Sequence, residues 1–270
     1  MKTFKVNSQT NLKDFTDSVY PQGSFCLAVL LRARDVKVNG TRINKNVALK
    51  TGDEVVYYTT SKQEQMPSHT AVYEDANIYI ADKYSGVSSE GLLSELCERG
   101  EFYAVHRLDR NTQGLIIFAR NNSAEEELLA AFKDRRIIKT YIALCRNNFK
   151  QKQGVLTDYL IKDDKKGEVK VYSSSRPEAV KIITEYRVIE ERGDTALAEI
   201  TLHTGRTHQI RAHTAFIGCP VLGDEKYGDR AYNAKYAAKR QRLIAKYLRF
   251  DLSGNLSYLN GKIFESGFTF

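Results

Sequence analysis

The chain of 270 residues carries 41 Lys and Arg against 33 Asp and Glu, which gives a formal net charge of +8. Hydrophobic residues make up 42% of the sequence and aromatic residues 10%, a content that supports a folded core and excludes a chain that is disordered throughout. The N-terminus has no apolar signal-like segment, no apolar run approaches the length of a membrane span, and the four cysteines form no CxxC pair. We therefore expect a cytoplasmic monomer without membrane contact.

The first 60 residues are predicted to form a small α/β module. Asn39-Gly40 lies between two apolar stretches, and Asn-Gly in this setting is a strong signal for a tight β-hairpin. Residues 61–73 are polar and show no periodicity, so a linker is expected there. Residues 74–270 are expected to form one larger domain.

The larger domain is predicted to be rich in strands. The expected strands are residues 77–83, 114–120, 137–145, 155–161, 169–172, 180–189 and 195–203. A helix is expected from Ser123 onward, because Ser123 and Glu126 have the spacing of a capping box. A second helix is expected over residues 207–217, where Gly218 ends it. Runs of strands with few helices predict an α+β fold with a mixed, mostly antiparallel β-sheet.

Positive charge is concentrated in the last third of the chain. Residues 206–249 contain ten Lys and Arg but three Asp and Glu. Such a concentration suits the phosphate backbone of a nucleic acid, where released counterions drive binding. A solvated basic helix over residues 234–249 accounts for the same charges, so charge alone leaves both interpretations open.

The segment 106–115, HRLDRNTQGL, places one carboxylate among two guanidiniums, an imidazole and a glycine turn. Cations close to Asp109 favour its ionised form. A carboxylate that acts as nucleophile or base must be ionised. Taken alone, however, the segment favours a structural turn, because Asp and Asn beside Gly are common turn formers.

A second segment, residues 202–213 with the sequence LHTGRTHQIRAH, runs from a predicted strand through a glycine turn into a helix. Helix N-termini attract anions through free backbone N–H groups and the helix dipole. His208 and Arg211 are three residues apart and share one helix face. The spacing of His203, His208 and His213 does not place the three on one face, so no metal site is expected.

The two segments closely resemble the motifs H-R-L-D-x-x-T-S-G-L and L-x-T-G-R-x-H-Q-I-R-x-H of the RluA-type pseudouridine synthases. The resemblance continues through Gly218 to Gly228, and residues 139–144 resemble the K-x-Y-x-A strand of that family. It covers about residues 72–250. The chain departs from the motifs at Gln113, where the family has serine, and at Ile244, where a histidine is common.

The resemblance implies an RNA pseudouridine synthase with Asp109 as the catalytic aspartate and Arg211 as its partner. Tyr141 would stack on the target base, although a tyrosine on a strand also fits a core position. The resemblance further implies that Arg107 grips a phosphate or fills the space of the flipped uridine, and that Leu202 forms a wall of the uracil pocket. The other expected substrate-binding residues are His106, Thr112, Arg206 and His208. The reaction needs no cofactor and no metal.

Residues 35–55 resemble the second half of a small RNA-binding module first seen in a ribosomal small-subunit protein. This resemblance implies RNA contacts by the module's basic residues, Arg32, Arg34, Lys37 and Arg42. A β-rich domain with solvated charges is the alternative. The attached module favours ribosomal RNA over tRNA as the substrate. A non-catalytic RNA-binding or ribosome-assembly protein on the same fold, and more remotely a hydrolase, are the competing hypotheses.

Overall fold

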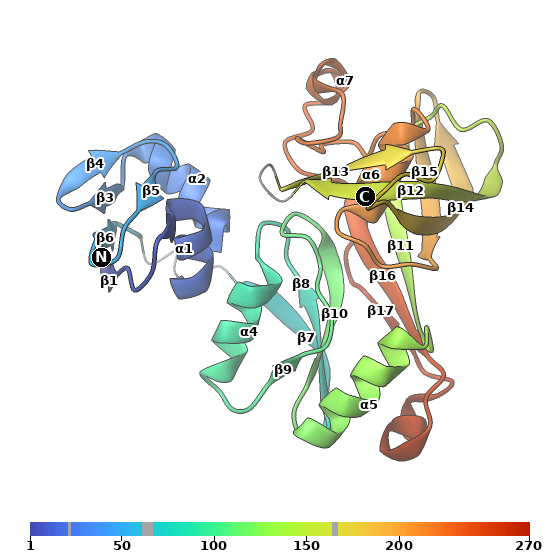
Figure 1. The fold of residues 1–270 in the computed structure, drawn as a ribbon, viewed down its shortest axis with the longest axis horizontal. Helices are drawn as coiled ribbons and strands as arrows, with labels where there is room; N and C mark the ends of the chain where they lie inside the picture. Colours follow the sequence, from blue (N-terminus) through green and yellow to red (C-terminus); the bar gives the residue numbers. More distant parts are fainter. Residues whose placement is uncertain (21–22, 61–66, 164–166) are drawn as a thin grey trace.

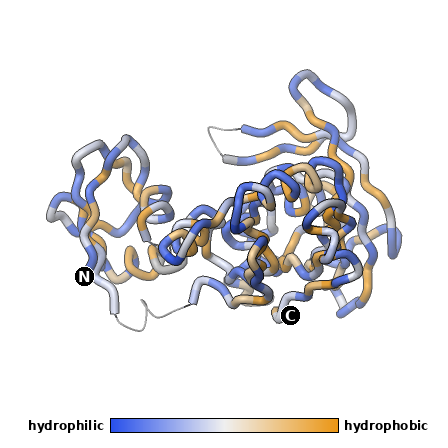
Figure 2. The backbone as a smooth tube through the Cα atoms, turned by 90° about the horizontal axis from the view of Figure 1, so that it is seen from below, coloured by the Kyte–Doolittle hydropathy of each residue, from blue (hydrophilic) through white to orange (hydrophobic). Residues whose placement is uncertain are grey.

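A computed structural model describes residues 1–20, 23–60, 67–163 and 167–270 of the chain (Figure 1). A small N-terminal unit lies beside a larger part that is built on one extended sheet. Figure 2 shows apolar segments inside both parts, and the small unit has a hydrophobic cluster of its own. No helix in the described part of the chain is both long enough and apolar enough to span a bilayer.

The N-terminal unit combines two helices with short strands. Its elements are β1 (Lys2–Lys5), β2 (Thr10–Asn11), α1 (Leu12–Val19), α2 (Gly23–Ala33), β3 (Val36–Val38), β4 (Thr41–Ile43), β5 (Ala48–Leu49) and β6 (Glu54–Tyr57). The strands β1, β6, β3 and β4 form one sheet in that order, and β2 pairs with β5. Asn39 and Gly40 have φ of 49° and 79°, so the predicted two-residue hairpin is confirmed, with both loop residues in the left-handed region.

The larger part contains an eleven-stranded sheet among the described residues. Its strands are β7 (His69–Glu74), β8 (Ile78–Lys83), β9 (Tyr103–Ala104), β10 (Gln113–Ala119), β11 (Ile137–Arg146), β12 (Gln153–Asp163), β13 (Glu168–Tyr172), β14 (Val180–Arg192), β15 (Thr195–Leu202), β16 (Leu243–Phe250) and β17 (Ile263–Glu265). The order is β13-β12-β14-β15-β11-β16-β10-β8-β7, with β17 on β16 and β9 on β10. β10 and β16 run parallel, whereas their neighbours pair antiparallel, which confirms the mixed sheet predicted from the sequence.

Helices cover both faces of this sheet near β10. The helices of this part are α4 (Ser89–Cys97), α5 (Asn122–Lys133), α6 (Gln209–Phe216), α7 (Arg230–Lys235) and the 3-10 helix η1 (Gly254–Leu259). Along β10, Ile116 belongs to the apolar cluster that contains Leu92 of α4, and Ile117 belongs to the cluster that contains Leu128 of α5. Side chains alternate between the faces of a strand, so a strand buried on both faces is apolar at consecutive positions.

Two local interpretations of the sequence differ from the structure. Helix α5 begins after Asn121, whose side chain accepts a hydrogen bond of 2.9 Å from the Ala124 N–H, so Ser123 is not the cap. The alternative of a basic helix over residues 234–249 is wrong, because only residues 234–235 belong to a helix, α7, and residues 243–249 form β16 between β11 and β10. Pairing with strands on both sides outweighs the local charge pattern there.

The predicted linker also differs in part from the structure. Residues 61–66 lie outside the described residues, but His69–Glu74 forms the edge strand β7. An edge strand that is largely exposed needs no alternation of apolar residues, so the segment shows no strand period in the sequence.

The N-terminal unit contacts the larger part next to the loop that precedes β10. The guanidinium of Arg110 forms an ion pair and a hydrogen bond with the Asp17 carboxylate of α1. Arg110 directly follows Asp109 in the chain. The small unit is therefore anchored one residue away from the predicted catalytic aspartate.

Candidate active site

The segment that precedes β10 carries Asp109 and is held by hydrogen bonds from the start of α4 and the end of β8. The Leu108 N–H donates to Ser89 Oγ (3.0 Å), and Ser89 Oγ donates to the Leu108 carbonyl (2.9 Å). The buried Lys83 ammonium donates to the carbonyls of Val87 (2.7 Å) and Arg110 (3.1 Å). Burial lowers the pKa of Lys83 to about 7, although Asp109 acts in the opposite direction. These contacts fix the backbone on both sides of Asp109.

Gly114, at the start of β10, allows the parallel strand β16 to approach closely. Its φ is +114°, and a Cβ at this position would lie 2.4 Å from the Ala245 carbonyl oxygen. No side chain fits there without moving the backbone of β16. The glycine of the first motif is therefore required by packing, and it places the Asp109 loop against the middle of the sheet.

Asp109 is held by an arginine that a second carboxylate also binds. Arg211 Nη1 donates to Asp109 Oδ2 at 2.9 Å. Arg211 Nε and Nη2 donate to the two oxygens of Asp224 at 2.7 and 3.0 Å. The Asp224 side chain is fully buried, while that of Asp109 remains 20% exposed. The arginine thus joins a buried carboxylate to one that faces the pocket.

The ionisation of this group of three side chains follows from its contacts. Burial alone would lower the pKa of Arg211, but the carboxylates of Asp224 and Asp109 raise it above its ordinary value. Burial opposes ionisation of Asp224, yet Arg211 and the backbone N–H groups of Tyr227 and Lys226 lower its pKa. Arg211 is therefore a permanent cation beside Asp109.

His208 is a second neighbour of the Asp109 carboxylate. The Val169 N–H donates to the Tyr227 hydroxyl (2.8 Å), and this hydroxyl is hydrogen-bonded to His208 Nδ1 at 2.9 Å. Burial lowers the pKa of His208, although Asp109 acts in the opposite direction. His208 Nε2 lies 3.9 Å from Asp109 Oδ2, the oxygen that also accepts from Arg211. Arg211 and His208 therefore lie next to the same oxygen of Asp109.

The turn between β15 and α6 is shaped by Gln209. Its Oε1 accepts from Thr204 Oγ1 (2.9 Å) and from the Arg206 N–H (3.1 Å). His208 has a φ of 53°, so the chain enters the helix from the left-handed region. The helix begins at Gln209, two residues later than predicted, because this turn precedes it. The turn directs Arg211 to Asp109 and leaves Arg206 on the opposite rim.

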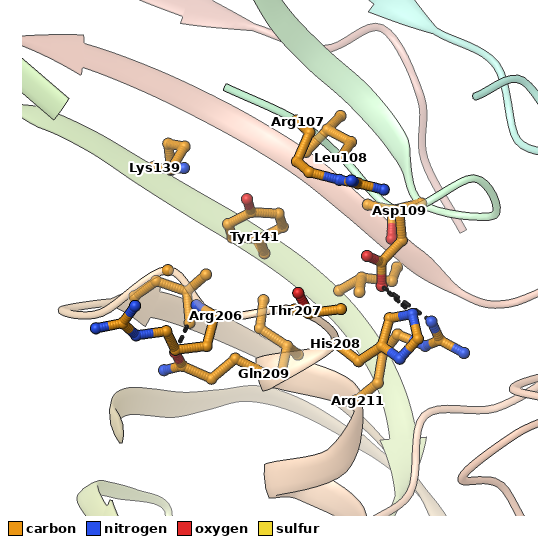
Figure 3. A pocket seen from close by; sticks show the side chains of 15 residues that line it. Arg107, Leu108, Asp109, Lys139, Tyr141, Arg206, Thr207, His208, Gln209 and Arg211 are labelled. Atoms are coloured by element: carbon orange, nitrogen blue, oxygen red, sulfur yellow. Dashed lines mark hydrogen bonds and ion pairs between the residues drawn. The ribbon is translucent and has the colours of Figure 1, made fainter. Parts of the chain in front are cut away.

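A small pocket of about 130 Å³ lies between the two motif segments (Figure 3). Tyr141 on β11 is buried at its centre, and burial raises the pKa of its phenol, which stays protonated at neutral pH. Leu202, Ile210 and Leu243 supply apolar lining. In Figure 3 Asp109 and Arg211 lie at one end of the pocket, and Lys139 lies at the other, beyond Tyr141.

The structure brings most of the predicted site residues together. The pocket lining includes Arg107, Asp109, Thr112, Tyr141, Leu202, Arg206, His208 and Arg211. Arg107 is exposed and forms a surface ion pair of 3.2 Å with Glu90. The Thr112 hydroxyl accepts a hydrogen bond of 3.0 Å from Gln241 and is buried.

The remaining predicted residues lie elsewhere. His106 is absent from this lining and packs against Phe132, with ring centroids 4.7 Å apart. The basic residues of the N-terminal unit, Arg32, Arg34, Lys37 and Arg42, do not line the pocket either. Lys37 and Arg42 both lie over the Tyr58 ring, with distances of 5.3 Å to its centroid.

Asp224, Tyr227 and Lys139 belong to the site or its support but are not among the site residues that the sequence predicts. Asp224 and Tyr227 belong to the string Gly223-Asp224-x-x-Tyr227, which extends the second motif, so position in the motif was the available signal. The three histidines of the second segment have separate partners: Glu185, Tyr227 and Asp158. No group of three metal-ligating side chains is found in the described ranges of the chain.

Comparison with known proteins identifies the family. The family model described as RNA pseudouridylate synthase matches residues 56–216. The chain belongs to the RNA pseudouridylate synthase family. It is an isomerase that converts uridine in RNA to pseudouridine.

Relatives of this enzyme include ribosomal large subunit pseudouridine synthase C of Vibrio cholerae, which is 31% identical over 82% of this chain and 78% of its own length. The protein of the same name from Escherichia coli is 31% identical over 76% and 71% of the two chains. Among solved structures, human RNA pseudouridylate synthase domain containing 1 aligns with a TM-score of 0.60 and 26% identity. That alignment covers 68% of this chain and 79% of the human one.

The two departures from the family motifs occupy neighbouring positions. Gln113 and Ile244 are paired in the register of the parallel strands β10 and β16. Gln113, which stands where the family has serine, therefore lies beside Ile244, which stands where the family often has histidine. Neither residue lines the pocket, whereas their chain neighbours Thr112 and Leu243 do.

Proposed function

We propose that this enzyme isomerises specific uridines of ribosomal RNA, with Asp109, Arg211 and Tyr141 as its reactive centre. The observation that carries the assignment is the 2.9 Å hydrogen bond from Arg211 to Asp109 at the wall of a pocket that both motif segments line. Ribosomal RNA as the substrate is supported by the names of the relatives from Vibrio cholerae and Escherichia coli.

The reaction breaks the bond between the ribose anomeric carbon and the uracil nitrogen, turns the base and joins it again through carbon 5. The proton displaced from carbon 5 is lost, and the nitrogen released from the sugar gains one. Asp109 starts this sequence in one of two ways: it attacks the anomeric carbon or removes the neighbouring ribose proton. Arg211 aims the carboxylate in either case.

The pocket must retain a uracil that is temporarily detached. Leu202, Ile210 and Leu243 form apolar walls that exclude water from the base. The Tyr141 ring provides a surface for stacking, and its neutral hydroxyl is available as a donor. The uridine leaves its stack to enter the pocket, which costs a few kcal/mol. Arg107, exposed at the rim, is placed to hold the displaced backbone or to fill the vacated space.

We further propose that residues 1–60 act as an RNA-binding unit attached to the catalytic domain. Arg34 and Arg42 are exposed and Lys37 is half-buried, and the cations of Lys37 and Arg42 both lie over the Tyr58 ring. An aromatic ring beside cations suits a nucleotide, which offers a base to stack on and a phosphate to pair with. The contact between Asp17 and Arg110 holds the basic surface of the small unit at a fixed distance from Asp109.

The test is pseudouridine formation by the purified protein on ribosomal RNA and on tRNA. Asp109→Asn keeps the shape of the side chain but removes its charge, so we expect no product and near-normal RNA binding. Asp229→Asn is the matched control, because Asp229 pairs with Arg146 away from the pocket. Turnover by pure Asp109→Asn at the control rate would overturn the assignment of Asp109. Product on tRNA but not on ribosomal RNA would overturn the substrate.

A further inference from the structure

Lys139 is a partly buried cation without an anionic partner among the described residues. It lies on β11, two residues before Tyr141, and no hydrogen bond or ion pair of its ammonium is found among the described residues. Its Nζ lies 5.0 Å from the centroid of the Phe132 ring. Burial lowers the pKa of Lys139 to about 8. Burying a charge is costly unless it is paired, so this position calls for an anion from outside the chain.

A groove of about 680 Å³ opens beside the catalytic pocket and shares Lys139, Leu202 and Arg206 with it. The apolar side chains of the groove are Val105, Phe132, Ile137, Ile138 and Leu202. Its further cations are Lys133 and Arg135, which are exposed at the end of α5. Figure 3 shows Lys139 and Arg206 on the side of Tyr141 that is remote from Asp109.

The polar groups of the groove favour an anion. None of the described residues that line it is an aspartate or a glutamate. His106 in its wall accepts a hydrogen bond of 3.0 Å from the Ile117 N–H at Nε2, and burial holds its pKa well below the usual range, so it stays neutral. The groove therefore has an apolar floor and cations, and its lining contains no carboxylate that would neutralise them.

A second groove, of about 550 Å³, opens on the Asp109 side of the pocket and differs in charge. Its lining mixes cations such as Lys13 and Lys226 with the carboxylates of Glu90, Glu168 and Glu225. Acidic groups repel a phosphate, so of the two grooves the one at Lys139 is the better match for a nucleotide.

We propose that the groove at Lys139 binds the nucleotide adjacent to the target uridine, with Lys139 paired to the phosphate that joins the two. The inference rests on the proposed RNA substrate and adds a subsite to it. The adjacent nucleotide is covalently attached to the uridine and must occupy a space that opens onto the pocket. The base of the adjacent nucleotide packs against the apolar floor of the groove. The phosphate between the two nucleotides pairs with the ammonium of Lys139 and the guanidinium of Arg206.

The test uses Lys139→Gln, which keeps most of the side-chain length and removes the charge, and Lys139→Arg, which restores a cation. RNA affinity is measured at several salt concentrations in the Asp109→Asn background, and kcat and KM in the active enzyme. We expect Lys139→Gln to raise KM about tenfold, with kcat changed less than about twofold. The slope of log affinity against log salt should fall by about 0.7, and Lys139→Arg should recover it.

Lys152→Gln is the matched control, because Lys152 is 80% exposed and pairs with Glu191 on the surface. Short RNAs with an abasic ribose on either side of the uridine give a second measurement, and a loss of affinity is expected on one side only. An unchanged KM and salt slope in Lys139→Gln would overturn the subsite. A fall in kcat at constant KM would also overturn it, because Lys139 would then act on the reaction itself. The binding measurements test the subsite even if the wild-type enzyme forms no product on ribosomal RNA, which is the result that counts against the proposed substrate.

Discussion

Asp109 and Asp224 share the guanidinium of one arginine. Arg211 donates two hydrogen bonds to the buried Asp224 and one to the partly exposed Asp109. Because Asp224 also accepts from the backbone N–H groups of Lys226 and Tyr227, it cannot move independently of its loop. The direction in which Arg211 presents its remaining N–H group to Asp109 is therefore set by a carboxylate that does not line the catalytic pocket.

Asp224→Asn should slow turnover while RNA binding stays close to normal. The amide cannot accept two N–H groups from Arg211, so the guanidinium turns and Asp109 loses its alignment. A misplacement of about 1 Å costs about 100-fold in rate. The measurements are kcat, KM and the free energy of unfolding, with Asp229→Asn as the control of equal charge. A variant that is destabilised but retains kcat would show that Asp224 serves folding alone.

Arg211→Lys should recover little of the activity that Arg211→Ala loses. A lysine carries the same charge, but its single ammonium cannot replace the planar guanidinium. The guanidinium donates two N–H groups to Asp224 and a third to Asp109. We expect kcat of the lysine variant to remain about 100-fold below the wild type. Single-turnover rates on saturating RNA provide the measurement. Wild-type rates in Arg211→Lys would mean that positive charge suffices and that the geometry is dispensable.

Lys83 should make stability depend on pH. Its pKa of about 7 in the folded chain lies below the ordinary 10.5, so between these values the unfolded chain binds more protons. Stability therefore rises with pH in this range. Between pH 7 and 9 the wild type should gain about 2 kcal/mol relative to Lys83→Met. Urea unfolding of both proteins at the two pH values measures this, and parallel pH profiles would contradict it.

The double variant Lys37→Gln/Arg42→Gln should weaken RNA binding without changing kcat. Removal of each cation that pairs with a phosphate should reduce the slope of log affinity against log salt by about 0.7 to 0.9. Lys262→Gln is the control, because Lys262 also lies over tyrosine rings, those of Tyr73 and Tyr258, but belongs to the larger part. An equal slope in the double variant and the control would show that the small unit does not bind RNA.

The family, the two motif segments and most strands could be predicted from the sequence because their signals are local. The strand β15 alternates in the sequence, and Ala196, Ala198 and Ile200 are buried as that pattern predicts. The hairpin at Asn39 requires left-handed residues, which Asn and Gly supply at little cost. The sequence also placed Asp109 and Arg211 in one site, although only through resemblance to a family, since the two lie 102 positions apart.

The partners of these residues were decided by tertiary structure. Asp224 contacts Arg211 because the loop after α6 folds back against that helix. No periodicity in the sequence predicts this contact. Lys139 has no carboxylate partner among the described residues, because the groove that it lines contains none. Segment 243–250 is a strand because two neighbours pair with it, despite its basic surroundings. Local sequence determines the elements and the reactive side chains, but desolvation and pairing over long distances along the chain decide which charges act together.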